Sequence, residues 1–227
     1  MKRKDIILNN EISELCVFTL NGYEQKVLIE GKRKDSPIII TLHGGPGTPI
    51  PFSVGCRGLF PAFTDIFIMV YWDQLGSGIN NYVIDDTFSI DSFVQMTEEL
   101  VAQIKKKFPN NKVMIFSTSW GSILSTKLLE RNPHSVDAVI ACGQIVKNVF
   151  ICDEVKNTLC KSGIPKKKLD RINNVTVENF KGKDLQLISD SLRKYTNAYQ
   201  NKIGAKAPMG PIIKGLLTSP DYKMKDF

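Results

Sequence analysis

Long apolar runs are absent from this sequence, which argues against a membrane protein. No stretch approaches the ~20 apolar residues that a membrane-spanning helix requires. The chain begins with basic residues, but only Ile6, Ile7 and Leu8 follow before polar residues return, whereas a signal peptide carries roughly 7–15 apolar residues at that place. We therefore expect neither a signal peptide nor an association with a membrane.

Cysteine and histidine are also scarce, with five and two residues in a chain of 227. The cysteines are odd in number, scattered, and without the paired spacing of a metal site. Reduced thiols in a cytoplasmic protein fit this pattern best, and we expect neither a metal nor another cofactor. The five positions are Cys16, Cys56, Cys142, Cys152 and Cys160.

The net charge of +7 raises the question of nucleic-acid binding, but its location argues against that function. Residues 1–146 hold 14 Lys/Arg and 15 Asp/Glu, whereas residues 147–227 hold 16 and 8. No nucleic-acid-binding signature accompanies the excess of Lys and Arg in residues 147–227. The densest run of basic residues there is 166–168. A solvated helical face is therefore favoured over a basic binding surface.

The rest of the composition is typical of a folded α/β protein. Hydrophobic residues make up 42% of the chain, enough for the core of one domain or of one domain with an insertion. Two β-rich runs flank Asn21-Gly22, a strong hairpin signal, and four further apolar runs are typical of buried strands. The six expected strands are 16–20, 25–29, 37–42, 66–71, 113–116 and 136–140.

Helical patterns alternate with these strands and then replace them. The alternation predicts a mostly parallel sheet with an amino-terminal antiparallel hairpin, and from residue 147 the strand signal disappears. We expect an α/β core over 1–146 and a helical cap-like segment over 147–227. The expected helices are 90–108, 122–129, 149–159, 169–172 and 185–199.

The segment 113–122 carries the clearest chemical signal. A buried strand runs directly into a tight turn and a helix, and such a turn presents its central serine, Ser119, above the carboxyl end of the sheet. The residues two positions before and two positions after Ser119 must be small, because the backbone passes close to itself at this turn. Ser117 and Gly121 occupy these positions. Taken alone, the pattern leaves open a plain strand–helix turn that contains serines.

Two further loops follow buried strands. The sequence His-Gly-Gly-Pro-Gly at 43–47 gathers glycines whose backbone N–H groups can point into a site, as an oxyanion hole requires. The segment 71–78 follows another strand. Because the carboxyl ends of parallel strands meet at one edge of a sheet, all three loops should lie together.

These segments resemble the α/β-hydrolase superfamily and, within it, the proline iminopeptidase-like group. The resemblance is carried by His43–Gly47, by the Asp73-Gln74-x-Gly76-x-Gly78 loop and by Ser119–Ser122, and it covers roughly residues 10–146. Residues 147–227 resemble the helical cap of that family more generally. The resemblance implies a serine hydrolase that acts on a small peptide, amide or ester through an acyl-enzyme.

The resemblance also implies a role for individual residues. Ser119 would be the nucleophile, and the N–H groups of Gly45 and Trp120 would bind the oxyanion of a tetrahedral intermediate. Seven residues would shape the loops without transferring protons: His43, Gly44, Pro46, Gly47, Asp73, Gln74 and Gly121.

The chain departs from the family pattern at several positions. Leu75 stands where the family usually has Arg, Asn80 where it has Ser, and Ser117 where it has Gly. The Trp-rich cap motif with which these peptidases read a free amine is absent, because both tryptophans, Trp72 and Trp120, precede the cap-like segment. Small esters or lactones are therefore alternative substrates.

A catalytic base is harder to find than the nucleophile. A serine hydroxyl needs a histidine, oriented by a carboxylate, to accept its proton, and in this fold that histidine follows the serine in the chain. The only later histidine is His134, which lies beyond the helix that starts just after Ser119. At 1.5 Å per residue, that helix places His134 roughly 20 Å from Ser119. His43 belongs to the oxyanion loop in the resembling family. We expect the acid and the histidine to lie beyond Phe227.

Two hypotheses therefore stand: a serine hydrolase that is incomplete as given, and a truncated or split hydrolase-fold protein without catalysis. In the resembling architecture the strand at 136–140 is internal, so a chain ending at Phe227 would leave it as an exposed edge. Self-association, or a second polypeptide that completes the sheet, is expected at that edge.

Overall fold

The computed structural model describes residues 2–84, 88–146, 151–176, 182–197 and 209–226. The chain divides into two compact units. The first, the sheet unit, comprises Met1–Gln144 with Pro208–Phe227, and the second, the helical unit, comprises Ile145–Ala207. Among the described residues, every strand lies in the sheet unit.

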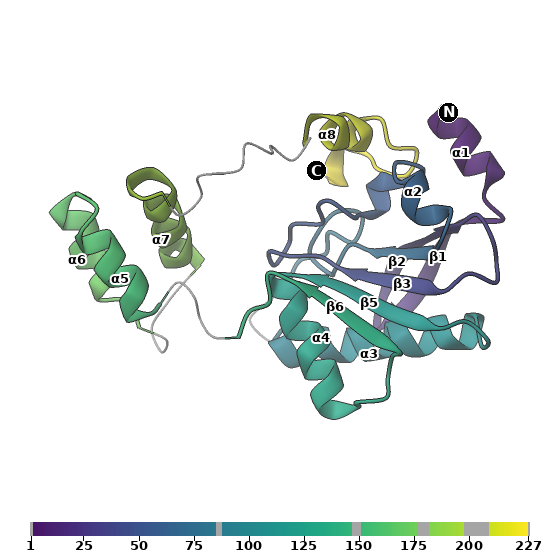
Figure 1. Cartoon of the computed structure of the whole chain (residues 1–227), viewed down its shortest axis with the longest axis horizontal. Helices are drawn as coiled ribbons and strands as arrows, with labels where there is room; N and C mark the ends of the chain where they lie inside the picture. The colour runs from purple at the N-terminus through teal and green to yellow at the C-terminus, as the bar shows by residue number, and fades with distance from the viewer. Residues whose placement is uncertain (1, 85–87, 147–150, 177–181, 198–208, 227) are drawn as a thin grey trace. The chain divides into compact units, whose positions relative to one another are not determined.

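The sheet has six strands in the order β1-β2-β4-β3-β5-β6 (Figure 1). The pairs β1–β2 and β2–β4 are antiparallel, and β4–β3, β3–β5 and β5–β6 are parallel. The expected α/β class, a mostly parallel sheet with an antiparallel hairpin at its start, is confirmed. The elements of this unit are α1 (Arg3–Asn9), β1 (Ile12–Leu20), β2 (Tyr23–Gly31), β3 (Ile38–Leu42), the 3₁₀ turn η1 (Val54–Cys56), α2 (Pro61–Thr64), β4 (Ile68–Trp72), α3 (Ile90–Lys107), β5 (Val113–Thr118), α4 (Trp120–Arg131), β6 (Ala138–Cys142), α8 (Met209–Leu217) and the 3₁₀ turn η2 (Met224–Asp226).

The hairpin forms where the sequence predicts it. Asn21 and Gly22 have φ values of +47° and +80°, the pair of positive values that a two-residue turn between twisted strands requires. Leu20 and Tyr23 are the first paired residues beyond the turn. The turn therefore fixes the register of the two strands.

The inner strands β3 and β4 are buried on both faces. Along β2, Val27 and Ile29 join the apolar core that includes residues of α3 and α4, whereas Leu28 joins a second core with Val54 and Tyr71. Figure 1 shows α3 and α4 together on one face of the sheet. The central strands thus carry continuous apolar runs, and their polar chemistry is confined to the loops at their ends.

The strand β6 lies at the edge of the sheet. Its side chains are mostly exposed, and Ile140 keeps 51% of its surface accessible. Among the described residues, only β5 pairs with it. The exposed edge expected for 136–140 is therefore present, although the strand begins two residues later.

The helical unit contains three described helices with an apolar core of their own. Its bounds differ from those expected: the helix predicted from residue 149 begins at Asp153, and the one predicted over 185–199 runs from Gly182 to Tyr195. Residues 149–150 and 198–199 of those predictions lie outside the described residues. The elements are α5 (Asp153–Cys160), α6 (Lys166–Asn173) and α7 (Gly182–Tyr195), and the core comprises Leu159, Ile164, Ile172, Val175, Ile188 and Leu192.

The expected division into 1–146 and 147–227 differs from the observed one at the carboxyl terminus. Residues 208–227 belong to the sheet unit, not to the cap-like segment. The physical reason is an ion pair in which the guanidinium of Arg57 contacts the carboxylate of Asp221 at 2.7 Å, with only 12% and 10% of the side chains exposed.

No described helix is long and apolar enough to cross a membrane.

Candidate active site

Ser119 occupies the turn between β5 and α4. Its φ of +49° lies in the left-handed region that residues other than glycine rarely adopt, and its side chain is exposed. The backbone N–H of Ser119 donates to the carbonyl oxygen of Cys142 at 3.0 Å, which ties the turn to the end of β6. A strained backbone at an exposed serine is the geometry of a nucleophile elbow.

Small residues permit this turn. A Cβ at Gly121 would overlap the carbonyl oxygen of Leu42 and lie 2.7 Å from its carbonyl carbon, so α4 can begin this close to β3 only with glycine there. Ser117, at the other small position, is fully buried, and its hydroxyl lies 2.9 Å from that of Ser125. The extra oxygen that Ser117 brings in place of glycine is thus paired inside the core.

The loop after β3 lies against the elbow. A Cβ at Gly44 would stand 3.3 Å from the Cβ of Ser119, and Gly45 has a φ of +120°. Thr48 N–H donates to the Gly44 carbonyl oxygen at 3.3 Å and closes the loop. No described group accepts a hydrogen bond from the backbone N–H of Gly45 or Trp120. Two unpaired donors therefore lie in the segments that meet at Ser119, as an oxyanion hole requires.

Gln74 joins the three loops. Its side-chain Nε2 donates to the carbonyl oxygen of His43 at 3.1 Å, while its Oε1 accepts from the indole Nε1 of Trp120 at 2.9 Å. Its carbonyl oxygen accepts from the hydroxyl of Ser77 at 2.7 Å. The buried side chain of Gln74 thus holds the 43–47 loop in place relative to the turn at Ser119. The sequence analysis predicted that these loops lie at one edge of the sheet, but it did not identify Gln74 as the residue that connects them.

His43 is committed to the loop structure. Its Nδ1 donates to the Gly44 carbonyl oxygen at 2.9 Å, and its Nε2 accepts from the backbone N–H of Gln74 at 2.9 Å. Burial lowers the pKa of His43 to about 4. A neutral imidazole with both nitrogens bonded has no lone pair available for the Ser119 proton. These contacts support the loop-shaping role.

His134 is exposed and lies past the opposite end of α4 from Ser119. The 12 residues of that helix span about 18 Å at 1.5 Å per residue. Both histidines of the sequence are therefore placed where they cannot accept the proton of Ser119 directly.

Asp73 is fully buried and accepts three hydrogen bonds. The donors are the backbone N–H groups of Val54 and Ile79, both at 3.0 Å, and the hydroxyl of Tyr222. Burial raises the pKa of Asp73 to about 6, and the hydrogen bonds oppose that rise. Asp73 therefore organises the loop and links it to the carboxyl-terminal segment.

Two positions at which the sequence departs from the family pattern have structural roles. The Asn80 side chain donates to the carbonyl oxygens of Asp73 and Lys26, at 2.7 and 2.9 Å, and accepts from Lys26 N–H at 2.7 Å. Leu75 is 3% exposed and belongs to the main apolar core. Of the two remaining loop positions, Pro46 follows a cis peptide bond and Gly47 has a φ of +82°.

The sequence matches the alpha/beta hydrolase fold family over residues 37–208. The chain belongs to the α/β-hydrolase fold family. A probable aminopeptidase, YbaC, from Bacillus subtilis (strain 168) is 28% identical over 148 residues, which are 64% of this chain and 44% of that protein. A proline iminopeptidase from Neisseria gonorrhoeae is 32% identical over 127 residues, 54% of this chain and 36% of that protein. The resemblance to the proline iminopeptidase-like group is thus confirmed.

Among solved structures, a proline iminopeptidase-related protein from Thermus thermophilus shares the fold. Its TM-score is 0.50 and its identity 19%, over 76% of this chain and 59% of that one. The chain spans less than half the length of the two curated relatives above.

Proposed function

We propose that this protein is a serine hydrolase of the aminopeptidase type with Ser119 as its nucleophile. The observation that carries the proposal is the exposed Ser119 at a positive φ, next to two backbone donors that have no acceptor among the described residues. The relatives described as a probable aminopeptidase and as a proline iminopeptidase support the substrate class.

The proposed reaction is acyl transfer through an acyl-enzyme. The Oγ of Ser119 attacks the carbonyl carbon of an amide or ester, and its proton passes to a base. The oxyanion that forms accepts hydrogen bonds from the N–H groups of Gly45 and Trp120, a kind of contact worth about 10²–10³ in turnover for each donor. The tetrahedral intermediate then expels the amine or alcohol, and water releases the acid from Ser119.

We propose that the base comes from outside the described site, because both ring nitrogens of His43 are bonded within its loop and His134 lies past the far end of α4. We propose that a longer form of the chain or a second polypeptide supplies it along β6. Ser119 N–H is bonded to the Cys142 carbonyl oxygen, so a strand added parallel to β6 would end beside the elbow. The exposed side chains of β6 are consistent with such an addition.

Chemical rescue by imidazole tests this proposal on the chain as it exists. A fluorophosphonate probe reacts when serine Oγ attacks phosphorus and fluoride leaves, so the rate of labelling measures activation of the hydroxyl. We expect slow labelling that mass spectrometry maps to Ser119, and a severalfold increase with free imidazole because it can accept the proton. Ser119→Ala should abolish both, whereas Ser189→Ala, at a half-buried serine of α7 in the helical unit, should change neither.

Two results would contradict the proposal. Labelling that persists in Ser119→Ala would place the nucleophile elsewhere. A complete lack of labelling with imidazole, in a chain whose folding is confirmed by a cooperative unfolding transition, would favour the non-catalytic hypothesis.

A further inference from the structure

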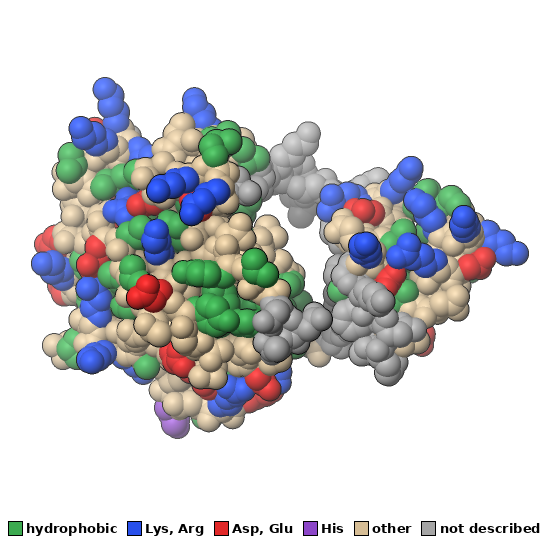
Figure 2. All heavy atoms as spheres, turned by 180° about the vertical axis from the view of Figure 1, so that it is seen from behind, with side chains coloured by type: hydrophobic (Ala, Val, Ile, Leu, Met, Phe, Trp, Pro, Cys, Tyr) green, Lys and Arg blue, Asp and Glu red, His purple; other side chains and the backbone are tan. Residues whose placement is uncertain are grey.

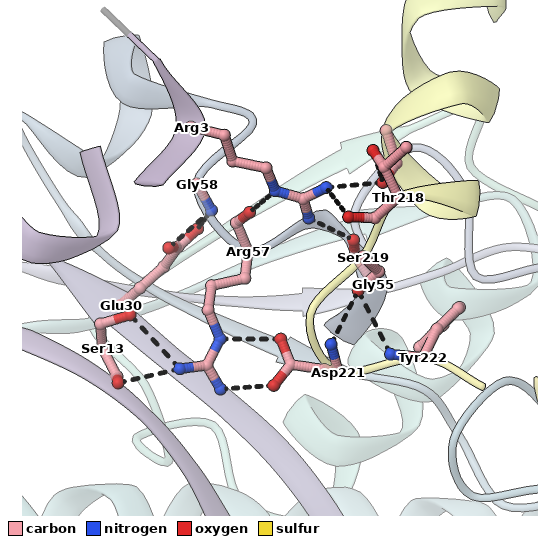
Figure 3. Close-up of polar contacts among 11 residues, drawn as sticks. Arg3, Ser13, Glu30, Gly55, Arg57, Gly58, Thr218, Ser219, Asp221 and Tyr222 are labelled. Carbon is pink, nitrogen blue, oxygen red and sulfur yellow. Dashed lines mark hydrogen bonds and ion pairs between the residues drawn. The ribbon is translucent and has the colours of Figure 1, made fainter. Parts of the chain in front are cut away.

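The carboxyl-terminal segment 218–226 is fastened to the rest of the sheet unit by two arginine side chains (Figure 3). Arg3 of α1 donates to the carbonyl oxygen of Thr218 at 3.2 Å. Arg57 donates two hydrogen bonds to the carboxylate of Asp221, at 2.7 and 2.8 Å. Two-bond contacts between a guanidinium and a carboxylate fix direction as well as distance, so the segment is held in one position.

Tyr222, which follows Asp221 directly, is held by both its backbone and its ring. The hydroxyl of Ser219 accepts hydrogen bonds from the backbone N–H groups of Asp221 and Tyr222, at 3.1 and 3.3 Å (Figure 3). The ring packs on Gly55, where a Cβ would lie 2.8 Å from the ring carbon Cε2. The direction of the Tyr222 hydroxyl is therefore set by the segment that carries it.

The Tyr222 hydroxyl donates to Oδ2 of Asp73, which is fully buried. The backbone N–H groups of Val54 and Ile79 also donate to this carboxyl group. Among the described residues, Tyr222 provides the only side-chain donor to it. A Cβ at Gly78 would overlap Asp73 Oδ2 and lie 2.6 Å from the Tyr222 hydroxyl, so the loop has a glycine where the two groups meet.

Gln74, the residue after Asp73, connects this contact to the candidate active site. Its backbone N–H donates to Nε2 of His43 at 2.9 Å, and its side-chain Nε2 donates to the His43 carbonyl oxygen at 3.1 Å. Its Oε1 accepts from the indole Nε1 of Trp120 at 2.9 Å. A displacement of Asp73 would therefore move the residue that holds together the two segments with the proposed oxyanion donors.

We propose that Tyr222 is a positioning residue for the candidate active site. It acts through Asp73 and Gln74. By fixing these two residues, it sets the distance between the backbone N–H groups of Gly45 and Trp120. This role rests on the proposed function, because the distance between the two donors matters only if an oxyanion forms there. The hydrogen-bonded coupling from Tyr222 to Trp120 does not rest on it.

Tyr222→Phe tests the proposal, because it removes the hydroxyl and keeps the ring. We expect fluorophosphonate labelling of Ser119 in the presence of imidazole to slow about tenfold, since a displacement of about 1 Å can cost about 10²-fold in rate. Tyr82→Phe is the matched control: its exposed hydroxyl donates to the carbonyl oxygen of Glu24 at 2.7 Å, and labelling should not change. Urea unfolding followed by tryptophan fluorescence confirms that both variants are folded during labelling.

The indole N–H signals of the two tryptophans give a readout that a general loss of stability would not produce. Trp120 donates to Gln74 and Trp72 donates to the side-chain oxygen of Gln25, both at 2.9 Å. In Tyr222→Phe the NMR signal of the Trp120 indole proton should shift, whereas the Trp72 signal should not. Trp72 is the last residue of β4, so a general disturbance at the end of that strand would alter its signal as well.

A second variant tests the route of the coupling. Gln74→Met removes the side-chain hydrogen bonds to His43 and Trp120 and keeps a side chain of similar length. In that background we expect Tyr222→Phe to slow labelling by less than about threefold further, because the effects of residues that act through one network are not additive. Independent residues would instead multiply their effects on the rate.

Unchanged labelling, or an unchanged Trp120 signal, in folded Tyr222→Phe would overturn the proposal. Equal shifts of both indole signals, or effects that multiply with Gln74→Met, would also overturn it. Failure of the proposed function is distinguishable from these results. A wild-type chain whose Ser119 is never labelled would remove the hydrolase, and with it the positioning role, even if the Trp120 signal still shifts. A labelled wild type that Tyr222→Phe leaves unaffected would remove the positioning role and keep the hydrolase.

Discussion

The two units of this chain differ in both charge and chemistry. The sheet unit carries 17 Lys/Arg and 17 Asp/Glu and so is neutral, whereas the helical unit carries 13 and 6, a net of +7. Figure 2 shows Lys and Arg side chains gathered on the visible face of the helical unit. Ser119 and the loop at 43–47 both belong to the neutral unit. The overall charge therefore says nothing of the electrostatics at the candidate site.

The units also differ in how they are held together. The sheet unit has two apolar cores, one largely buried ion pair and the buried carboxyl groups of Glu30 and Asp73, whereas six buried apolar side chains form the core of the helical unit. Both tryptophans, Trp72 and Trp120, lie in the sheet unit. Tryptophan fluorescence therefore reports unfolding of that unit alone, while far-UV circular dichroism reports the helices of both.

The largest effect is expected from Arg57→Met. The change leaves Asp221 buried without its counter-charge and should lower the unfolding free energy of the sheet unit by about 4 kcal/mol. Urea unfolding followed by tryptophan fluorescence measures this loss. Arg33→Met breaks an ion pair whose partners are 63% and 76% exposed, and it should cost less than about 0.5 kcal/mol. Equal losses in the two variants would contradict the role of the buried pair.

Glu30→Gln should change how the stability of the sheet unit depends on pH. Burial raises the pKa of Glu30 from 4.5 to about 7. A carboxyl with a raised folded pKa gives its full stability below pH 4.5 and loses it as pH rises through 7, a loss of about 3 kcal/mol.

The glutamine variant should lack that loss, so its stability relative to the wild type should rise from pH 4.5 to pH 8. Asp73, whose pKa is about 6, titrates in the same window in both proteins, so the difference between them isolates Glu30. Glu24→Gln, at an exposed position, is the matched control. A constant difference between wild type and Glu30→Gln across this range would refute the assignment.

Gly121→Ala should destabilise the sheet unit by about 2 kcal/mol, because the added methyl group meets the backbone of Leu42. It should also slow Ser119 labelling, since it displaces the start of α4. Gly210→Ala places the same methyl group where no atom lies within 4 Å, and it should leave the fluorescence transition unchanged or slightly raised. Gly121→Ala and Gly210→Ala behaving alike would show that the elbow is not tightly packed.

Ile172→Val should produce the smallest effect and confine it to the other unit. Ile172 is fully buried in the helical core, and removal of one methylene group there costs about 1 kcal/mol. The circular dichroism transition should shift while the fluorescence transition and Ser119 labelling stay unchanged. Ile40→Val, in the fully buried core of the sheet unit, should instead shift the fluorescence transition together with the part of the circular dichroism change that comes from that unit. A shift of the fluorescence transition by Ile172→Val would show that the two units unfold together.

The sequence alone was sufficient for features that depend on local pattern. Continuous apolar runs marked the inner strands, Asn21-Gly22 marked the hairpin, and the strand–turn–helix signal marked Ser119. Each of these follows from residues close together in the chain, so periodicity and turn chemistry could reveal them.

The features that were missed depend on contacts between distant segments. The helix α8 contains Gly210, Pro211 and Gly215, which disfavour a helix, and Arg3, 212 residues before Gly215, bonds to its carbonyl oxygen. No local pattern could join Tyr222 to Asp73, 149 residues away. The sequence pattern therefore could not show that residues 208–227 form one compact unit with the sheet.

The pH dependence of Ser119 labelling by a fluorophosphonate tests the central claim most directly. With neither histidine as base, the rate of labelling should show no step between pH 5 and 8, and His134→Gln should leave it unchanged. An imidazole base with the ordinary histidine pKa of about 6.5 would instead give a step in this range. His43, whose pKa burial lowers to about 4, would give its step below this range. Fast labelling with a step in either range, or labelling lost in His134→Gln, would contradict the account.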